Sequence, residues 1–131
     1  MLPPTPPKNR FLGRQAILDQ KMDLYGYELL FRAGRVNAFS GNAEDATNQT
    51  IDSCLSMTAC SSSKKLFINC TRKALVGMSV KLLPSRTFIL EILEEVTPDA
   101  ELVRACKELK RCGFRLALDD FSPHDNKGEL V

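Results

Sequence analysis

The sequence predicts an α/β protein that begins with a β-hairpin and continues with strand–helix units. Two apolar segments, residues 11–18 and 24–32, flank a short polar stretch, which is the pattern of a hairpin. A helical pattern over 98–112 lies between two apolar strands, at 86–92 and 114–121. Because a strand, a helix and a strand joined by short connections form a right-handed βαβ unit, we expect these later strands to be parallel.

The second hairpin strand alternates along its length, and this predicts the direction of its side chains. One face is expected to carry Tyr25, Tyr27, Leu29 and Phe31. The other face is expected to carry Gly26, Glu28, Leu30 and Arg32. An acid and a base beside a leucine are unusual for a face that only meets solvent.

The helix over 98–112 has recognisable start and stop signals. Thr97 is the expected N-cap, Pro98 the first helical residue and Gly113 the residue after the C-terminus. Its buried stripe is expected to consist of Leu102, Cys106 and Leu109.

The middle of the chain is predicted with less detail. Apolar spacing predicts a helix over 43–59, and residues 65–70 predict a short buried strand. The stretch 71–83 is ambiguous and fits one helical turn followed by a loop.

The composition is that of one folded domain. The chain has 131 residues, and with 44% apolar and 26% charged residues it is not a disordered chain. The net charge of +2 is too balanced to favour a nucleic acid or an anionic membrane as partner. No apolar run approaches the ~18–20 residues of a membrane span, and no signal-peptide pattern opens the chain. We therefore expect a cytoplasmic protein without a nucleic-acid polymer or a membrane as partner.

Prolines and cysteines complete the outline of the domain. Residues 3–7 read Pro-Pro-Thr-Pro-Pro, so 1–10 is predicted to be a mobile leader before a domain at 11–131.

The five cysteines are an odd number without a C-x-x-C pair, and His124 is the single histidine. This pattern does not predict a zinc site and is typical of reduced thiols.

Oxygen-bearing side chains occur at or near the carboxyl ends of the predicted strands. They are Glu28, Asn69, Glu91, Asp119 and Asp120. Several carboxylates buried together must share protons, meet cations or bind a metal. Their oxygens suit Mg²⁺ or Mn²⁺ better than zinc. In parallel α/β sheets, sites are built at this end of the strands. The alternative is that each acid faces water or caps the next helix.

Five segments of the chain carry a family resemblance. Residues 27–32 (Tyr-Glu-Leu-Leu-Phe-Arg), preceded by 14–17 (Arg-Gln-Ala-Ile), are the first two. The others are 67–70 (Phe-Ile-Asn-Cys), 90–94 (Leu-Glu-Ile-Leu-Glu) and 118–121 (Leu-Asp-Asp-Phe). In this order they resemble the motifs of the EAL domain family of cyclic di-GMP phosphodiesterases and receptors. The first strand pair looks closest to the EAL half of EAL–HDOD signalling proteins.

The resemblance implies a fold and a set of ligands. The fold is the N-terminal half of a TIM-type (β/α)8 barrel. The ligands implied for one divalent metal, Mg²⁺ or Mn²⁺, are Glu28, Asn69, Glu91 and Asp119. Asp120 would hold a second metal, and Gln15 and Arg32 would contact cyclic di-GMP. Two metals would activate a water and clamp the phosphodiester.

The chain also departs from the family pattern. Ala16 stands where the family usually has Pro, and Leu93 where it usually has Thr. Residues 122–127 (Ser-Pro-His-Asp-Asn-Lys) replace a glycine-rich loop. A full barrel needs ~250 residues, so the chain is expected to stop before the strand with the family's catalytic Lys. No residue is therefore assigned a catalytic role.

The sequence is compatible with three functional interpretations. The first is a truncated EAL-type signalling domain that binds metal and cyclic di-GMP but is catalytically incompetent alone. The second is a non-enzymatic protein-interaction or regulatory module derived from an EAL domain. The third is a segment without independent function. An open half-barrel would expose an unpaired strand, so a protein partner or self-association is also expected.

Overall fold

A computed structural model of the chain describes residues 11–32, 51, 63–94, 96–119 and 130–131. The predicted proline-rich leader lies outside the described residues. The predicted helix over 43–59 also lies outside them, except for Ile51, which is helical and buried.

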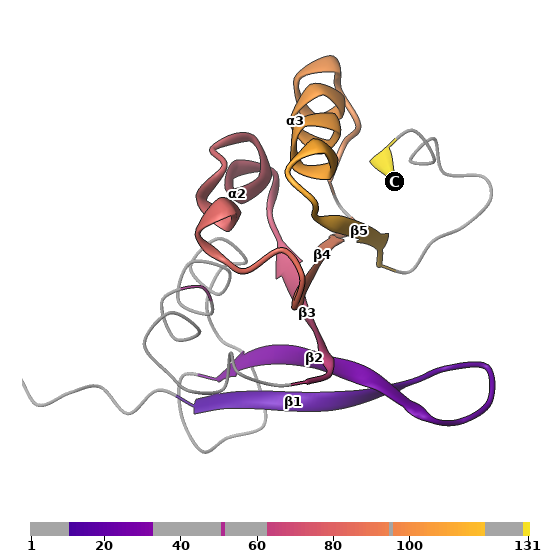
Figure 1. Ribbon diagram of the computed structural model, residues 1–131. Coiled ribbons are helices and arrows are strands. Elements are labelled where there is room, and N and C mark those ends of the chain that lie inside the picture. Colours follow the sequence, from indigo (N-terminus) through magenta and orange to yellow (C-terminus); the bar gives the residue numbers. More distant parts are fainter. Residues whose placement is uncertain (1–10, 33–50, 52–62, 95, 120–129) are drawn as a thin grey trace, which may run out of the picture.

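Five strands form one sheet in the order β1-β2-β3-β4-β5 (Figure 1). The strands are β1 Phe11–Leu18, β2 Leu24–Arg32, β3 Lys65–Cys70, β4 Phe88–Ile92 and β5 Arg115–Leu118. β1 and β2 pair antiparallel, whereas each later strand pairs in parallel with its predecessor. The predicted hairpin, the parallel strands and the α/β class are therefore confirmed.

The helical segments are α2 Arg72–Val76, the 3₁₀ helix η2 Ser79–Leu82 and α3 Ala100–Arg111. The ambiguous stretch 71–83 thus holds two short helical segments. Both α-helices pack on the same face of the sheet (Figure 1). Among the described helices, none has the length and apolar character needed to cross a bilayer.

A bulge in the hairpin corrects one prediction. The register passes from Ile17 opposite Gly26 to Leu18 opposite Leu24, which leaves Tyr25 as an extra residue in β2. The ring of Tyr25 packs against Phe67, with centroids 6.0 Å apart. The extra residue interrupts the alternation, so the prediction that Tyr25 shares a face with Tyr27 and Leu29 was wrong.

Gly26 is required where the bulge meets β3. A Cβ atom built at this position would lie 2.3 Å from the backbone carbonyl oxygen of Lys65. Because that neighbour is backbone and cannot rotate away, only glycine allows β2 and β3 to approach this closely.

The N-terminus of α3 corrects a second prediction. Asp99, not Thr97, is the N-cap: its backbone is extended, and Oδ1 accepts a hydrogen bond from the Leu102 amide at 2.8 Å. The helix therefore begins at Ala100 and excludes Pro98. An aspartate satisfies the first-turn amides and also places a negative charge at the positive end of the helix dipole.

The other end of α3 agrees with the sequence. Gly113 follows the C-cap residue Cys112 with φ +96°, the left-handed conformation that glycine adopts easily. The predicted buried stripe is confirmed, with Ala105 added to Leu102, Cys106 and Leu109.

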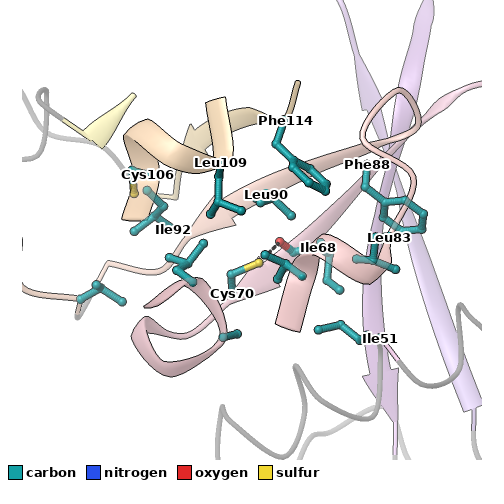
Figure 2. Close-up of a cluster of buried hydrophobic side chains, with 14 of the residues drawn as sticks. Ile51, Ile68, Cys70, Leu83, Phe88, Leu90, Ile92, Cys106, Leu109 and Phe114 are labelled. Atoms are coloured by element: carbon teal, nitrogen blue, oxygen red, sulfur yellow. Dashed lines mark hydrogen bonds between the residues drawn. The ribbon is translucent and has the colours of Figure 1, made fainter. Parts of the chain in front are cut away.

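The hydrophobic core lies between the sheet and these helices (Figure 2). We call the buried strand residues that enter it the core face; they are Leu29, Leu66, Ile68, Cys70, Phe88, Leu90 and Ile92. Leu75 of α2 and Leu109 of α3 close the cluster from the other side, and both are fully buried. Within the described residues Cys70, Cys106 and Cys112 are free thiols, and burial raises the pKa of Cys70.

Candidate functional site

The opposite face of the sheet carries the polar residues. Asn69 and Glu91 alternate with the core residues of β3 and β4, so their side chains leave the strands on the other side. We call this side the site face; its described members on β2, β3 and β4 include Glu28, Phe67, Asn69, Ile89 and Glu91. One strand thus supplies both the core and the candidate site.

Glu28 and Asn69 are in direct contact. Nδ2 of Asn69 donates a hydrogen bond to Oε1 of Glu28 at 3.0 Å, joining β2 to β3. The two residues are distant in the sequence and are brought together by the parallel pairing of these strands. The contact is half-buried, which strengthens it relative to a surface hydrogen bond.

Glu91 continues the same row on β4. It is directly opposite Asn69 in the β3–β4 register. Oδ1 of Asn69 and Oε2 of Glu91 are both buried from solvent. Two buried oxygens on neighbouring strands match the donor type that Mg²⁺ and Mn²⁺ prefer.

Asp119 lies at the carboxyl end of β5. Its backbone amide donates to the carbonyl oxygen of Ile92 at 3.0 Å, so the chain is still held beside the end of β4 at this point. Asp120 lies outside the described residues. We call Glu28, Asn69, Glu91 and Asp119 the acidic row.

The acidic row crosses four neighbouring strands. Within the part of the chain that the structure describes, no three His, Cys, Asp or Glu side chains are gathered closely enough to hold a metal ion. The carboxylates of the row are instead spaced along the sheet, with an amide between Glu28 and Glu91.

The two predicted nucleotide-contacting residues lie on the hairpin. Gln15 of β1 is directly opposite Glu28 in the antiparallel ladder and is exposed. Arg32 is the last residue of β2, and its side chain lies outside the described part of the structure.

Two residues that carry no motif in the sequence also meet on the site face. Nη1 of Arg115 donates a hydrogen bond to Oη of Tyr25 at 3.1 Å. A regular alternation assigns Tyr25 to the wrong face, so only knowledge of the bulge could have revealed this pair. The Phe67 ring against Tyr25 supports the same placement.

Leu93, which stands where the motif that it resembles usually has threonine, packs against the core cluster. β4 ends at Ile92, and the chain turns there, with the Val96 amide donating to the Leu93 carbonyl oxygen. The turn directs an apolar side chain toward the helices instead of the site face.

Fold and site together define an α/β sheet with an oxygen-rich row across neighbouring strands and at their carboxyl ends.

No protein-family model matches the chain. It is 39% identical over 116 residues to the cyclic di-GMP phosphodiesterase CdgJ of Vibrio cholerae and 33% identical over 115 residues to the uncharacterised protein YuxH of Bacillus subtilis. Each match covers 85% of this chain but only 27% and 28% of the respective relative. The chain thus spans about a quarter of the length of the curated relatives that it matches.

A solved structure has a similar fold. It is the S helix–GGDEF–EAL portion of Vibrio cholerae LapD, bound to cyclic di-GMP, with a TM-score of 0.60. The similarity covers 93% of this chain and 36% of that one at 12% sequence identity, so it concerns the fold alone. The chain is thus similar in sequence to a cyclic di-GMP phosphodiesterase and in fold to an EAL-containing structure.

Proposed function

We propose that this chain forms the metal- and nucleotide-binding first part of an EAL-type cyclic di-GMP signalling domain. The 39% identity to a cyclic di-GMP phosphodiesterase supports the proposal, as does the fold shared with an EAL-containing structure. In this proposal the five strands are the first strands of a TIM-type barrel, and the domain works in the cytoplasm.

The Glu28–Asn69 hydrogen bond is the observation that carries the proposal. It brings together the acid of one family-like motif and the amide of the next, at 3.0 Å. Glu91, from a third motif, is in register with Asn69 on the following strand. Three separate sequence motifs therefore converge on one face of one sheet.

The proposed metal is Mg²⁺ or Mn²⁺. Glu28, Asn69, Glu91 and Asp119 would hold one ion, and Asp120 a second. Bound metal would supply positive charge to a phosphodiester and lower the pKa of a coordinated water. The buried oxygens of Asn69 and Glu91 fit such an ion.

The hairpin would recognise the nucleotide. Gln15, opposite Glu28, can offer an amide to a ligand that lies over the acidic row. Arg32 would contribute a guanidinium, whose planar fork of donors suits a phosphate.

We also propose that the 131-residue chain binds without efficient hydrolysis. The substitution of Leu93 for the family's usual threonine supports this, because its apolar side chain packs against the core cluster and brings no polar group to the site. The same observation favours the second candidate function, a non-enzymatic interaction or regulatory module.

Calorimetric titration of the chain with cyclic di-GMP in the presence of Ca²⁺ tests the proposal. We expect saturable binding that is lost in Glu28→Ala and in Arg32→Ala. Asp23→Ala, which removes an exposed acid from the same hairpin, is the control and should bind as the wild type does.

Absence of binding by a folded wild-type chain would contradict the proposal and favour the interaction module. Hydrolysis is measured separately with Mn²⁺. Linear product at an enzymatic rate, abolished by Glu28→Ala, would show that the chain is a phosphodiesterase and overturn the claim of binding alone.

A further inference from the structure

A hydrogen bond on the site face joins two strands that are not neighbours. Nη1 of Arg115 in β5 donates to Oη of Tyr25 in β2, and β3 and β4 lie between these strands. We call this contact the Tyr25–Arg115 bridge.

The residues that lie between Tyr25 and Arg115 on the site face are apolar. Arg115 is the register partner of Ile89, and Ile89 is the partner of Phe67. The Tyr25 ring meets the Phe67 ring at an interplanar angle of 60°. Phe67 and Ile89 are both buried, although they face away from the core cluster. The bridge therefore spans an apolar strip on the site face.

To bind one ion, the side-chain oxygens of the acidic row must lie closer together than the strands of a flat sheet would place them. Neighbouring strands are ~4.8 Å apart, so β2 and β5 would be separated by ~14 Å in a flat sheet. A small divalent ion holds its oxygen ligands at about 2.1 Å. The site face must therefore be concave if Glu28 and Asp119 are to reach the same ion.

The bridge lies on the same two outer strands as these residues. Tyr25 precedes Glu28 on β2, and Arg115 precedes Asp119 at the end of β5. A bond between Tyr25 and Arg115 restrains the distance between β2 and β5, and with it the curvature of the face between them.

We propose that the Tyr25–Arg115 bridge positions Asp119 relative to Glu28 and thereby sets the metal affinity of the acidic row. Tyr25 and Arg115 are positioning residues and not ligands. This inference rests on the proposed metal-binding function. Because the bridge is exposed, its loss should affect stability little and should be detected chiefly in metal binding.

Three conservative variants isolate the bridge. Tyr25→Phe removes the hydroxyl and keeps the ring on Phe67. Arg115→Met keeps an unbranched side chain without a donor, and Arg115→Lys retains a donor. Each variant and the Tyr25→Phe/Arg115→Met double variant are titrated with Mn²⁺ by calorimetry, beside Glu28→Ala.

We expect Tyr25→Phe and Arg115→Met each to weaken Mn²⁺ binding about threefold, because coupled contacts of this kind carry modest free energies. The double variant should be no weaker than the single ones, since both remove the same bond. Arg115→Lys should bind nearly as tightly as the wild type.

The outcomes separate this inference from the proposed function. If Glu28→Ala abolishes binding while Tyr25→Phe and Arg115→Met bind as the wild type does, the positioning role is overturned and the metal site stands. If Glu28→Ala binds as well as the wild type, or the folded wild type does not bind, the proposed metal site is wrong and the affinity part of the inference falls with it.

The structural part of the inference is decided without metal. Hydrogen exchange of the Asp119 amide, which is bonded to the Ile92 carbonyl oxygen, reports how firmly the end of β5 is held. We expect faster exchange in Tyr25→Phe and in Arg115→Met. Unchanged exchange in both would overturn the claim that the bridge positions Asp119.

Discussion

The core face and the site face are built from the same strands, but the core face carries only apolar residues, whereas the site face adds polar residues beside an apolar strip. On β4 the core face presents Phe88, Leu90 and Ile92, all fully buried. The site face presents Ile89 and Glu91 from the same strand. Because side chains alternate across a strand, stability and chemistry can be assigned to opposite sides of one sheet. Substitutions on the two faces should therefore have separable effects.

The largest effect is expected on the core face. Leu90→Ala removes a fully buried side chain from the middle of the cluster (Figure 2). We expect it to lower the free energy of unfolding by about 3 kcal/mol, from lost transfer free energy and the cavity that remains. Urea denaturation measures the change. An unaltered midpoint would mean that the helices do not seal this face as described.

The next largest effect on stability is expected at Gly26, where β2 approaches β3. Gly26→Ala places a methyl group against the Lys65 carbonyl oxygen, so β2 must move away from β3. We expect a loss of about 2 kcal/mol in the same denaturation assay, as for other overpacked sites. The move should also weaken the Glu28–Asn69 contact, so Mn²⁺ affinity should fall as well. Retention of wild-type stability would argue against the close approach of these two strands.

A smaller, pH-dependent effect on stability is expected at Asp99, the N-cap of α3, in the helix layer over the core face. The pKa of Asp99 lies below its ordinary value of 3.8, chiefly because the Leu102 amide donates to its carboxylate and also because Arg72 lies beside it. The folded state thus binds this proton less tightly than the unfolded chain. The stability from Asp99 is present above the ordinary pKa and is lost as the pH falls through the lower folded value.

Two variants at this cap separate geometry from charge. Asp99→Asn keeps an oxygen acceptor for the Leu102 amide but has no charge, so its melting temperature should depend less on pH than that of the wild type as the pH falls below the ordinary pKa of 3.8. Asp99→Ala should melt lower than the wild type near neutral pH. Identical pH dependence in Asp99→Asn and in the wild type would contradict the role of the charge.

The smallest effect on stability is expected in the acidic row. Glu28→Gln retains an oxygen that can accept the hydrogen bond from Asn69. Without metal, its free energy of unfolding should stay within about 0.5 kcal/mol of the wild type, whereas its Mn²⁺ affinity should fall sharply. A loss as large as that of Leu90→Ala would show that the two faces are not separable.

Local patterns in the sequence were sufficient for most of the fold. Apolar runs and the helical spacing at 98–112 predicted the hairpin, the parallel strands and the buried stripe of α3. They failed at Thr97 because the N-cap is set by where the backbone becomes helical, and Asp99 is still extended while Ala100 is the first helical residue. They failed at Tyr25 because a bulge changes the alternation without changing the composition of the strand.

The candidate site was predictable in part. The position of Asn69 and Glu91 at or near the carboxyl ends of their strands was predicted, and the register shows that they are neighbours. The contact between Glu28 and Asn69 depends on β2 pairing with β3, which no local pattern specifies. The Tyr25–Arg115 bridge depends in addition on the bulge in β2, which the sequence pattern does not show.

The pairing of β2 with β3 has a consequence for folding kinetics. Residues 19–23 join β1 to β2 and residues 93–114 join β4 to β5, whereas the longer stretch 33–64 separates β2 from β3. Pairing strands that are farther apart along the chain costs more chain entropy, so the β2–β3 seam should form late during folding and open early during unfolding. Glu28 and Asn69 face each other across the seam. An ion bound there would slow unfolding at the place where the chain comes apart first.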